Sequence, residues 1–405
     1  MKKILYLILM LPIIILVGCS PVSGGDPDPQ QHEEPEEHNN TAEEQSTRQE
    51  TLQQDTTDEP ALDADPVQTP EPEPDQESIH EQETKPETRP VFGFIDAHAD
   101  TISRALLLAQ EKQGIYDNSE LHIDFKRLSE FEAPVQVFAA WCAERYIPIA
   151  FEQTNIMFDF LEQEIAKHND MIEIALDLED IRRIASEGKI SAILAIEGGE
   201  ALMGKIENLE HFYNRGVRIL GLTWNRENAL GFGQATGSGR GLKPFGIECI
   251  QKMDELGMIA DVSHLNEAGF WDVHNIGTRP YMASHSNAYS LLQHNRNLND
   301  DQIMAIVERG GIIGFNMYPV FVAKNGKAAM GDIMAHFKHF IQIGAGDHIG
   351  LGCDFDGIDS TPEGIKDITS LKILEERLKE EFNEETSYKI MEGNFYEFFK
   401  RYFEG

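Results

Sequence analysis

From residue 91 onward, short apolar runs alternate with longer stretches in which apolar residues recur every three or four positions. The short runs predict buried β-strands, and the longer stretches predict amphipathic helices. Eight strand segments are expected: 92–98, 135–141, 191–197, 217–224, 258–264, 280–285, 311–317 and 349–354. Helical patterns lie between them, for example at 245–256, 300–309 and 333–343, and two more follow the last strand at 368–382 and 385–403.

This alternation predicts an α/β fold with a parallel sheet. Eight strands, each followed by a helix, is the number found in a (β/α)8 TIM barrel. A doubly wound open sheet is the alternative, because it is built from the same units. We therefore predict one TIM-barrel domain over residues 91–405.

The beginning of the chain has a different pattern. Lys2 and Lys3 precede an apolar run at 4–17, which is shorter than the ~20 residues of a spanning helix and leads through Gly18 to Cys19. This arrangement is typical of a bacterial lipoprotein signal, so we predict a signal peptide at 1–18 and lipidation of Cys19. The protein would then be exported and anchored on the outer side of the bacterial cytoplasmic membrane. An ordinary secretory signal and an uncleaved anchor are the alternatives.

Charge and composition set residues 19–90 apart from the rest of the chain. Residues 20–90 contain 21 acidic and 3 basic residues, a net charge of −18 and half of the −36 of the whole chain. So few large apolar side chains cannot offset the entropy of ordering, which predicts a disordered acidic linker. An acidic tail that binds cations or basic partners is the alternative. The domain is acidic too, which argues against nucleic acid as a partner.

Cysteine supplies no disulfide framework for this domain. If Cys19 carries lipid, Cys142, Cys249 and Cys353 remain, which is an odd number. The fold must therefore depend on its apolar core.

Polar residues gather where the predicted strands end. Five ends carry the sequences DAHAD at 96–100, EGGE at 197–200, DVSH at 261–264, SHSN at 284–287 and DFDG at 354–357. In a TIM barrel the active site is built from the carboxyl ends of the strands and the loops after them. These side chains should therefore converge at one mouth of the barrel.

Several of these side chains are metal ligands by type and spacing. His98 and Asp100 are two positions apart on one strand, so both can face one ion. His264 and His285 stand at two other strand ends, and Glu197 ends an apolar strand where an unpaired carboxylate would be costly to bury. A carboxylate between two cations would be stabilised, so we predict a metal pair. A buried hydrogen-bonded cluster is the alternative.

Two further residues suggest what the metal pair does. A metal pair activates water and polarises a substrate carbonyl. Asp354 is then a candidate to handle the proton, although an Asp there also suits a helix cap or turn. Arg296 follows the sixth strand and could bind a substrate carboxylate through both of its terminal nitrogens, with an ordinary surface arginine as the alternative.

Together these motifs resemble those of a known family. The segments 96–100, 196–199, 261–264, 283–286, 296–298 and 352–357, in this order and followed by 393–395, resemble the membrane (renal-type) dipeptidases. These are zinc peptidases of the amidohydrolase-like TIM-barrel group, and the resemblance extends over residues 94–395. It implies two Zn²⁺ ions per chain and hydrolysis of the peptide bond of dipeptides, including those with a C-terminal D-residue.

The resemblance also implies roles for individual residues. Five would hold the zinc ions: His98 and Asp100 the first, His264 and His285 the second, and Glu197 both. Arg296 would meet the substrate carboxylate, and Asp354 would meet its amino group or transfer the proton. A hydroxide that bridges the metals would attack the peptide carbonyl. Family members are often dimers, so a homodimer is expected.

One position departs from the family pattern. Some members have a histidine at the end of the fourth strand that contacts the substrate or the developing oxyanion, and this chain has Trp224 there. The indole N–H can donate a hydrogen bond but cannot act as a cation. Asn225 or His294 could replace the histidine. Tyr318 is a candidate to line the substrate pocket, with simple packing as the alternative.

Two other functions stay open at this stage. A different binuclear amidohydrolase would use the same metal pair on N-acyl amino acids or lactones. A binding lipoprotein would capture a peptide or a metal without turnover. The complete set of expected ligands favours an enzyme, and the free ends of a dipeptide would satisfy Arg296 and Asp354 together.

Overall fold

A computed structural model describes residues 91–108 and 114–404. The predicted signal peptide, Cys19 and the linker at 19–90 lie outside these residues. Among the described residues, no helix has the length and apolar character needed to cross a membrane.

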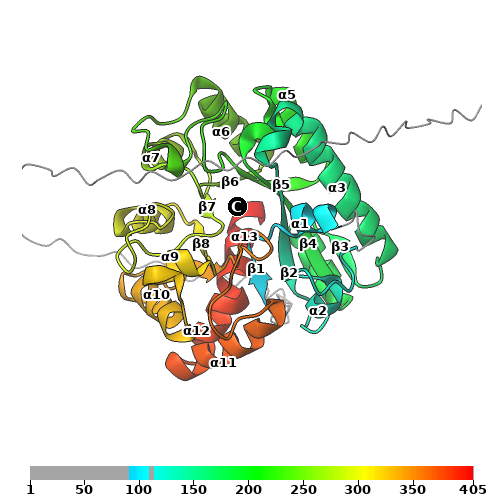
Figure 1. The fold of residues 1–405 in the computed structure, drawn as a ribbon, viewed down its shortest axis with the longest axis vertical. Helices are drawn as coiled ribbons and strands as arrows, with labels where there is room; N and C mark the ends of the chain where they lie inside the picture. The colour runs from blue at the N-terminus through cyan, green and yellow to red at the C-terminus, as the bar shows by residue number, and fades with distance from the viewer. Residues whose placement is uncertain (1–90, 109–113, 405) are drawn as a thin grey trace, which may run out of the picture. The chain divides into compact units, whose positions relative to one another are not determined.

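The predicted strands close into a barrel (Figure 1). Its eight strands are β1 (Ile95–Asp96), β2 (Val135–Trp141), β4 (Ile190–Glu197), β5 (Val217–Gly221), β6 (Ile259–Asp261), β7 (Met282–Ala283), β8 (Ile312–Phe315) and β9 (Ile349–Leu351). All neighbours are parallel, and β2 pairs with β4 as well as with β1. The pairing of β2 with β4 closes the sheet, so the (β/α)8 prediction is confirmed and the open sheet is excluded.

One strand was not predicted. β3 (Ile172–Ile174) pairs with the first residues of β4, on the edge that β5 occupies further along. It has only three residues, with a glutamate in the middle, so its apolar pattern is too short to stand out. It extends the sheet beside the barrel and does not change the strand count of the barrel.

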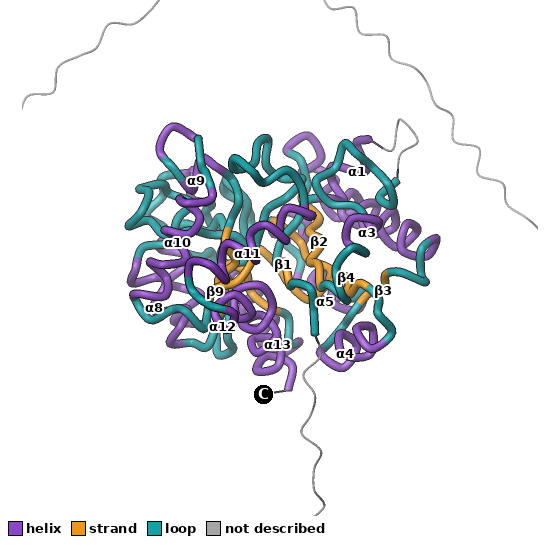
Figure 2. The backbone as a smooth tube through the Cα atoms, turned by 90° about the horizontal axis from the view of Figure 1, so that it is seen from below, coloured by secondary structure: helices purple, strands orange, loops and turns teal. Residues whose placement is uncertain are grey.

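Helices surround the strands (Figure 2). They are α1 (Thr101–Leu108), α2 (Phe125–Leu128), α3 (Ala150–Lys167), α4 (Leu178–Ser186), α5 (Ile206–Asn214), α6 (Pro244–Leu256), α7 (Glu267–Ile276), α8 (Asp300–Glu308), α9 (Pro319–Val322), α10 (Met330–Gln342), α11 (Leu371–Glu381), α12 (Glu384–Tyr388) and α13 (Asn394–Glu404). Their ends follow local signals. For example, α6 has Pro244 in its first turn and ends at Gly257, whose φ of +73° suits glycine.

The last helices differ from the simple prediction. The segment predicted at 368–382 begins as a 3-10 turn, Ile368–Ser370, before α11. The segment predicted at 385–403 consists of α12, a π-helical turn at Lys389–Gly393, and α13. A short 3-10 or π-helical turn hardly changes the spacing of apolar residues along the sequence, so the sequence pattern did not reveal these turns.

The C-terminal helix closes one end of the barrel. Side chains of Phe398, Phe399 and Tyr402 share one core cluster with inward-facing strand residues such as Ile95 and Ile193. Figure 1 shows α13 at the centre of the ring of strands, and Figure 2 shows it below them. The amino ends of the strands are therefore covered, and the carboxyl ends remain for a site.

A buried carboxylate joins the two ends of this domain. Glu392 accepts a 2.6 Å hydrogen bond from the backbone N–H of Phe92, and burial raises the pKa of Glu392 to about 7. Because the folded state binds this proton more tightly than the unfolded state, stability falls as pH rises from about 4.5 to about 7.

We expect Glu392→Gln to become more stable than the native chain as pH rises from 5 to 8, by up to about 3 kcal/mol. Glutamine keeps the hydrogen-bond acceptor and removes the charge. Urea unfolding of both proteins at pH 5 and pH 8, without added metal, measures the difference. A stability difference that is equal at the two pH values would contradict this prediction.

Candidate metal centre and active site

Glu197 lies at the centre of a buried cluster. It is the last residue of β4 and faces the same side as Ile193 and Ala195, which fill the barrel. Its Oε2 lies 3.6 Å from Nε2 of His98, and its Oε1 lies 2.9 Å from Nε2 of His264. Each carboxylate oxygen therefore faces a different group of ligands, as a bridging carboxylate requires.

The first group consists of His98, Asp100 and Glu197. His98 Nε2 lies 3.7 Å from Asp100 Oδ2, so the two side chains converge as their spacing predicted. Both residues are buried, yet His98 Nε2 and Asp100 Oδ1 have no hydrogen-bond partner among the residues that the structure describes. Buried polar atoms without partners are rare and costly. A cation placed among them would remove that cost.

The second group consists of Glu197, His264 and His285. Asn225 Oδ1 lies 2.8 Å from His264 Nδ1, so that nitrogen donates its hydrogen. Ser284 donates its hydroxyl hydrogen to Asp261 Oδ2 and lies 2.7 Å from His285 Nδ1, which therefore donates to it. Both rings then present Nε2 lone pairs to each other, 2.8 Å apart with no hydrogen between them. Two facing lone pairs repel unless a cation lies near both.

The distances between the ligand atoms and the charges of the ligand side chains both fit divalent metal ions. Zinc lies about 2.0–2.2 Å from nitrogen and oxygen ligands, so ligand atoms around one ion stand roughly 3.3 Å apart. The distances between ligand atoms within the two groups, from 2.8 to 3.7 Å, surround that value. Burial and the charge of Asp100 raise the pKa of Glu197 to about 8, because carboxylates crowd together there. Burial lowers the pKa of His264 and His285 well below 6.5, which keeps them neutral as ligands must be.

Asp354 lies beside this cluster. Its Oδ1 is 4.0 Å from His98 Nε2, and its Oδ2 accepts a 2.9 Å hydrogen bond from Asn316 Nδ2. Burial raises the pKa of Asp354 to about 6, despite the opposing effect of His98. A Cβ on Gly357 would stand 2.2 Å from Asp100 Oδ2 and 2.6 Å from Asp354 Oδ1, so any larger residue there would displace one or both carboxylates.

The backbone is strained at two of these residues. His264 has a φ of +68° and Asp354 a φ of +61°, a region that residues with a side chain rarely adopt. Such strain persists where the surrounding structure fixes it, and it concentrates at functional sites. Both residues stand three positions after the end of a strand, β6 and β9 respectively, and their side chains lie in the cluster.

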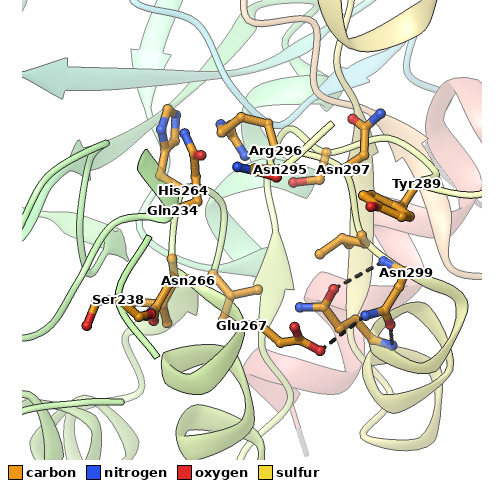
Figure 3. Close-up of a pocket in the computed structure, with 15 residues that line it drawn as sticks. Gln234, Ser238, His264, Asn266, Glu267, Tyr289, Asn295, Arg296, Asn297 and Asn299 are labelled. Atoms are coloured by element: carbon orange, nitrogen blue, oxygen red, sulfur yellow. Dashed lines mark hydrogen bonds between the residues drawn. The ribbon is translucent and has the colours of Figure 1, made fainter. Parts of the chain in front are cut away.

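Arg296 borders a cavity of about 400 Å³ next to His264. The guanidinium is buried; its Nη2 donates to the carbonyl of His285, and its Nε has no hydrogen-bond partner within 91–108 and 114–404. Figure 3 shows Arg296 and Asn295 at one wall of this cavity beside His264, with Glu267 and Asn299 at the opposite wall. The guanidinium also lies over the ring of Phe321, and in the described part of the chain no carboxylate forms an ion pair with it. A buried cation of this kind suits an anionic group of a substrate.

Of the other predicted residues, one lies beside the cluster and three are engaged in contacts of their own. Trp224 lies beside the cluster, with its ring 6.2 Å from that of His264. Asn225 is occupied in orienting His264. His294 packs against Phe321 and accepts a hydrogen bond from the backbone of Arg296. Tyr318 also packs against Phe321, so the structure adds no support for it as a substrate contact.

Sequence reasoning missed the residues that orient the ligands. Asp261 and Ser284 stand within the polar strand ends but were assigned no role, and Asn316 directly follows the apolar β8. Trp141, at the end of β2, was also not considered. The signal they share is a polar or aromatic residue at the end of a buried strand or directly after it, and their partners become known only in three dimensions.

We expect Ser284→Ala to lower zinc affinity by about 10- to 100-fold, since it removes the hydrogen bond that fixes His285. Competition with a chromophoric chelator measures the affinity. Ser290→Ala is the matched control, because Ser290 is exposed in the same loop and contacts Asp300 instead. Equal affinities in the two variants would show that Ser284 does not orient the ligand.

A closed parallel barrel with buried histidines and carboxylates at the carboxyl ends of its strands is typical of metal-dependent hydrolases of the TIM-barrel class. Residues 89–402 match the family described as membrane dipeptidase, peptidase family M19. The chain therefore belongs to this family of metallopeptidases.

Individual relatives agree with this assignment. An uncharacterised dipeptidase of Schizosaccharomyces pombe is 32% identical over 265 residues, which span 61% of this chain and 64% of that relative. A crystal structure of a family M19 dipeptidase has a TM-score of 0.73 at 26% identity, covering 77% of this chain and 99% of that one. A metallo peptidase from Rhodobacter sphaeroides, liganded with a phosphinate mimic of L-Ala-D-Ala, has a TM-score of 0.70 at 25% identity, with coverages of 76% and 98%.

Proposed function

We propose that this chain is a dipeptidase that works with two zinc ions. The observation that carries the proposal is the pair of Nε2 lone pairs on His264 and His285, which face each other beside Glu197. Histidine nitrogens together with carboxylate oxygens favour zinc over magnesium or calcium, which prefer oxygen ligands alone. His98 and Asp100 would hold the first ion, His264 and His285 the second, and Glu197 both.

The remaining residues suit a substrate with two free ends. Bound zinc would supply an activated water and a polarised carbonyl. Arg296 would bind the substrate carboxylate through its guanidinium. Asp354, held by Asn316, would accept the substrate's ammonium group or carry a proton to the leaving amine. A dipeptide has both charged ends within reach of one metal pair, whereas a longer peptide does not.

We further propose that the second residue of the substrate can have the D configuration. The support is the Rhodobacter sphaeroides metallo peptidase, which is similar to this chain and was crystallised with a mimic of L-Ala-D-Ala. The cavity of about 400 Å³ beside Arg296 offers space for the side chain of the substrate's second residue.

Amino-acid release from a panel of dipeptides tests the proposal. The full chain, reconstituted with zinc, is given L,L and L,D dipeptides with free or acetylated amino ends. We expect release from the free dipeptides and little from the acetylated ones. Release only from acetylated substrates would favour an amidohydrolase of N-acyl amino acids, and zinc binding without any release would favour a binding protein.

We also propose that the protein is exported, anchored through lipid on Cys19 to the outer side of the bacterial cytoplasmic membrane, and a homodimer. The support for the anchor is the sequence pattern at 1–19, and for the dimer the family resemblance. Labelling with a radioactive fatty acid should mark the native chain and not Cys19→Ser. Label on both proteins would refute the anchor, and a monomeric mass in light scattering would refute the dimer.

A further inference from the structure

A second cavity lies on the other side of the metal centre. It has a volume of about 230 Å³ and borders Asp100 and Glu197, whereas the Arg296 cavity borders His264. Its apolar walls are Trp141, Trp224 and Leu107. For comparison, an apolar protein cavity of about 150 Å³ is large enough to bind benzene.

The fold holds the two tryptophans in place. Trp141 ends β2 and pairs with Glu197 of β4, which puts it directly beside the central carboxylate. Its backbone N–H donates to Ser103 Oγ on α1, and its carbonyl accepts from that hydroxyl. The rings of Trp141 and Trp224 are 5.1 Å apart at an angle of 61°, an edge-to-face pair that forms an aromatic corner.

The positions of Arg296, Glu197 and Asp100 across the site determine the orientation of a bound dipeptide. Its carboxylate belongs beside Arg296 on the His264 side, and its scissile bond belongs at Glu197. Its first residue must then extend to the Asp100 side, where the aromatic corner lies.

We propose that the corner of Trp141 and Trp224 receives the side chain of the substrate's N-terminal residue and selects large apolar or aromatic side chains there. This inference rests on the proposed dipeptidase function and names its substrate class. An aromatic side chain against two indole rings buries more apolar surface than a methyl group does, and enzymes convert such differences into selectivity.

The charged groups around this cavity do not favour a charged side chain. Asp100 and Glu197 are turned toward the metal centre. The carboxylate of Asp356 accepts hydrogen bonds from Thr101 Oγ and the backbone N–H of His122. Arg104 is exposed and remains in water, so an acidic side chain would gain little from it.

Selectivity on three dipeptides tests the inference with the zinc-reconstituted full chain. We expect kcat/KM for Phe-Ala to exceed that for Ala-Ala by about 10-fold or more, and Glu-Ala to be poorer still. Trp141→Ala and Trp224→Ala should each reduce the Phe-to-Ala ratio by about fivefold, whatever they do to the absolute rate. Trp271→Phe is the control, because Trp271 lies on α7 outside this cavity. The ratio of kcat/KM for Phe-Ala to that for Ala-Ala should be unchanged in this variant.

Binding gives a readout that needs no turnover. The chain has three tryptophans, so Trp271→Phe leaves tryptophan fluorescence, excited selectively over that of tyrosine, only from Trp141 and Trp224. Titration with L-phenylalanine should change this fluorescence saturably, at concentrations at least tenfold lower than L-alanine requires.

The outcomes separate the two proposals. If dipeptides are cleaved but the tryptophan variants keep the native Phe-to-Ala ratio, the inference is wrong and the dipeptidase function stands. A preference for Glu-Ala that disappears in Arg104→Gln would also overturn it. If no dipeptide is cleaved, the proposed function fails, and the titration alone decides whether the corner binds an aromatic side chain.

Discussion

Glu197→Gln is expected to lower kcat for dipeptide hydrolysis by at least about 1,000-fold. Glutamine has nearly the same shape, but it replaces one carboxylate oxygen with an amide NH2 that would face His98 or His264. In the proposed two-metal centre, one of the metal positions would then lose an anionic ligand. Metal ions supply several kcal/mol of transition-state stabilisation, and each 1.36 kcal/mol is a tenfold change in rate.

Metal content distinguishes this explanation from a general loss of structure. Mass spectrometry of the purified proteins should find about two zinc ions in the native chain and fewer in Glu197→Gln. Glu200→Gln is the matched control: the same residue type three positions later, outside the metal-ligating groups. Full zinc content and full activity in Glu197→Gln would refute the bridging role.

Asp354→Asn is expected to lower kcat by about 100- to 10,000-fold while leaving the zinc content unchanged. Asparagine can still accept the hydrogen bond from Asn316, so the loop should keep its position. It cannot take up or deliver a proton, and proton transfer by a positioned side chain contributes rate factors of this size. Steady-state kinetics on a free dipeptide, with zinc measured on the same preparation, provides the test.

The metal measurement matters because Asp354 has a second interpretation. Its carboxylate also forms a ligand-type group with His98 and His285. A loss of zinc in parallel with activity would make Asp354 a metal ligand rather than a proton carrier. Asp359→Asn, an exposed position in the same loop, should retain both zinc and activity.

The site illustrates which features a sequence reveals. His98 and Asp100 were predicted to share one ion from their spacing along a strand, and their ligand atoms do converge. The predicted strand was too long, however: β1 ends at Asp96, and Ala99, which lies between the two ligands, continues the pairing as an isolated parallel bridge to Phe355. Glu197 was predicted to be buried because it ends an apolar strand, and it is buried. Side-chain direction along a strand repeats every two residues, so this part of the geometry is local.

Orientation of the ligands could not be predicted in the same way. His264 and His285 depend on Asn225 and Ser284, and Ser284 depends in turn on Asp261. The contact between Asn225 and His264 joins residues 39 positions apart. Hydrogen bonds of this kind leave no periodic pattern, because they form only after the barrel has closed.

By itself the sequence determined the order of eight strands, the polar residues at their carboxyl ends and the unusual composition of residues 1–90, because strand periodicity, ligand chemistry and charge density are local properties. Tertiary structure alone decided the rest. Closure through β2 and β4 placed Trp141 beside Glu197 and opposite Trp224, and α13 covered the other end of the barrel. These contacts depend on how distant segments pack, and no short stretch of the chain encodes that.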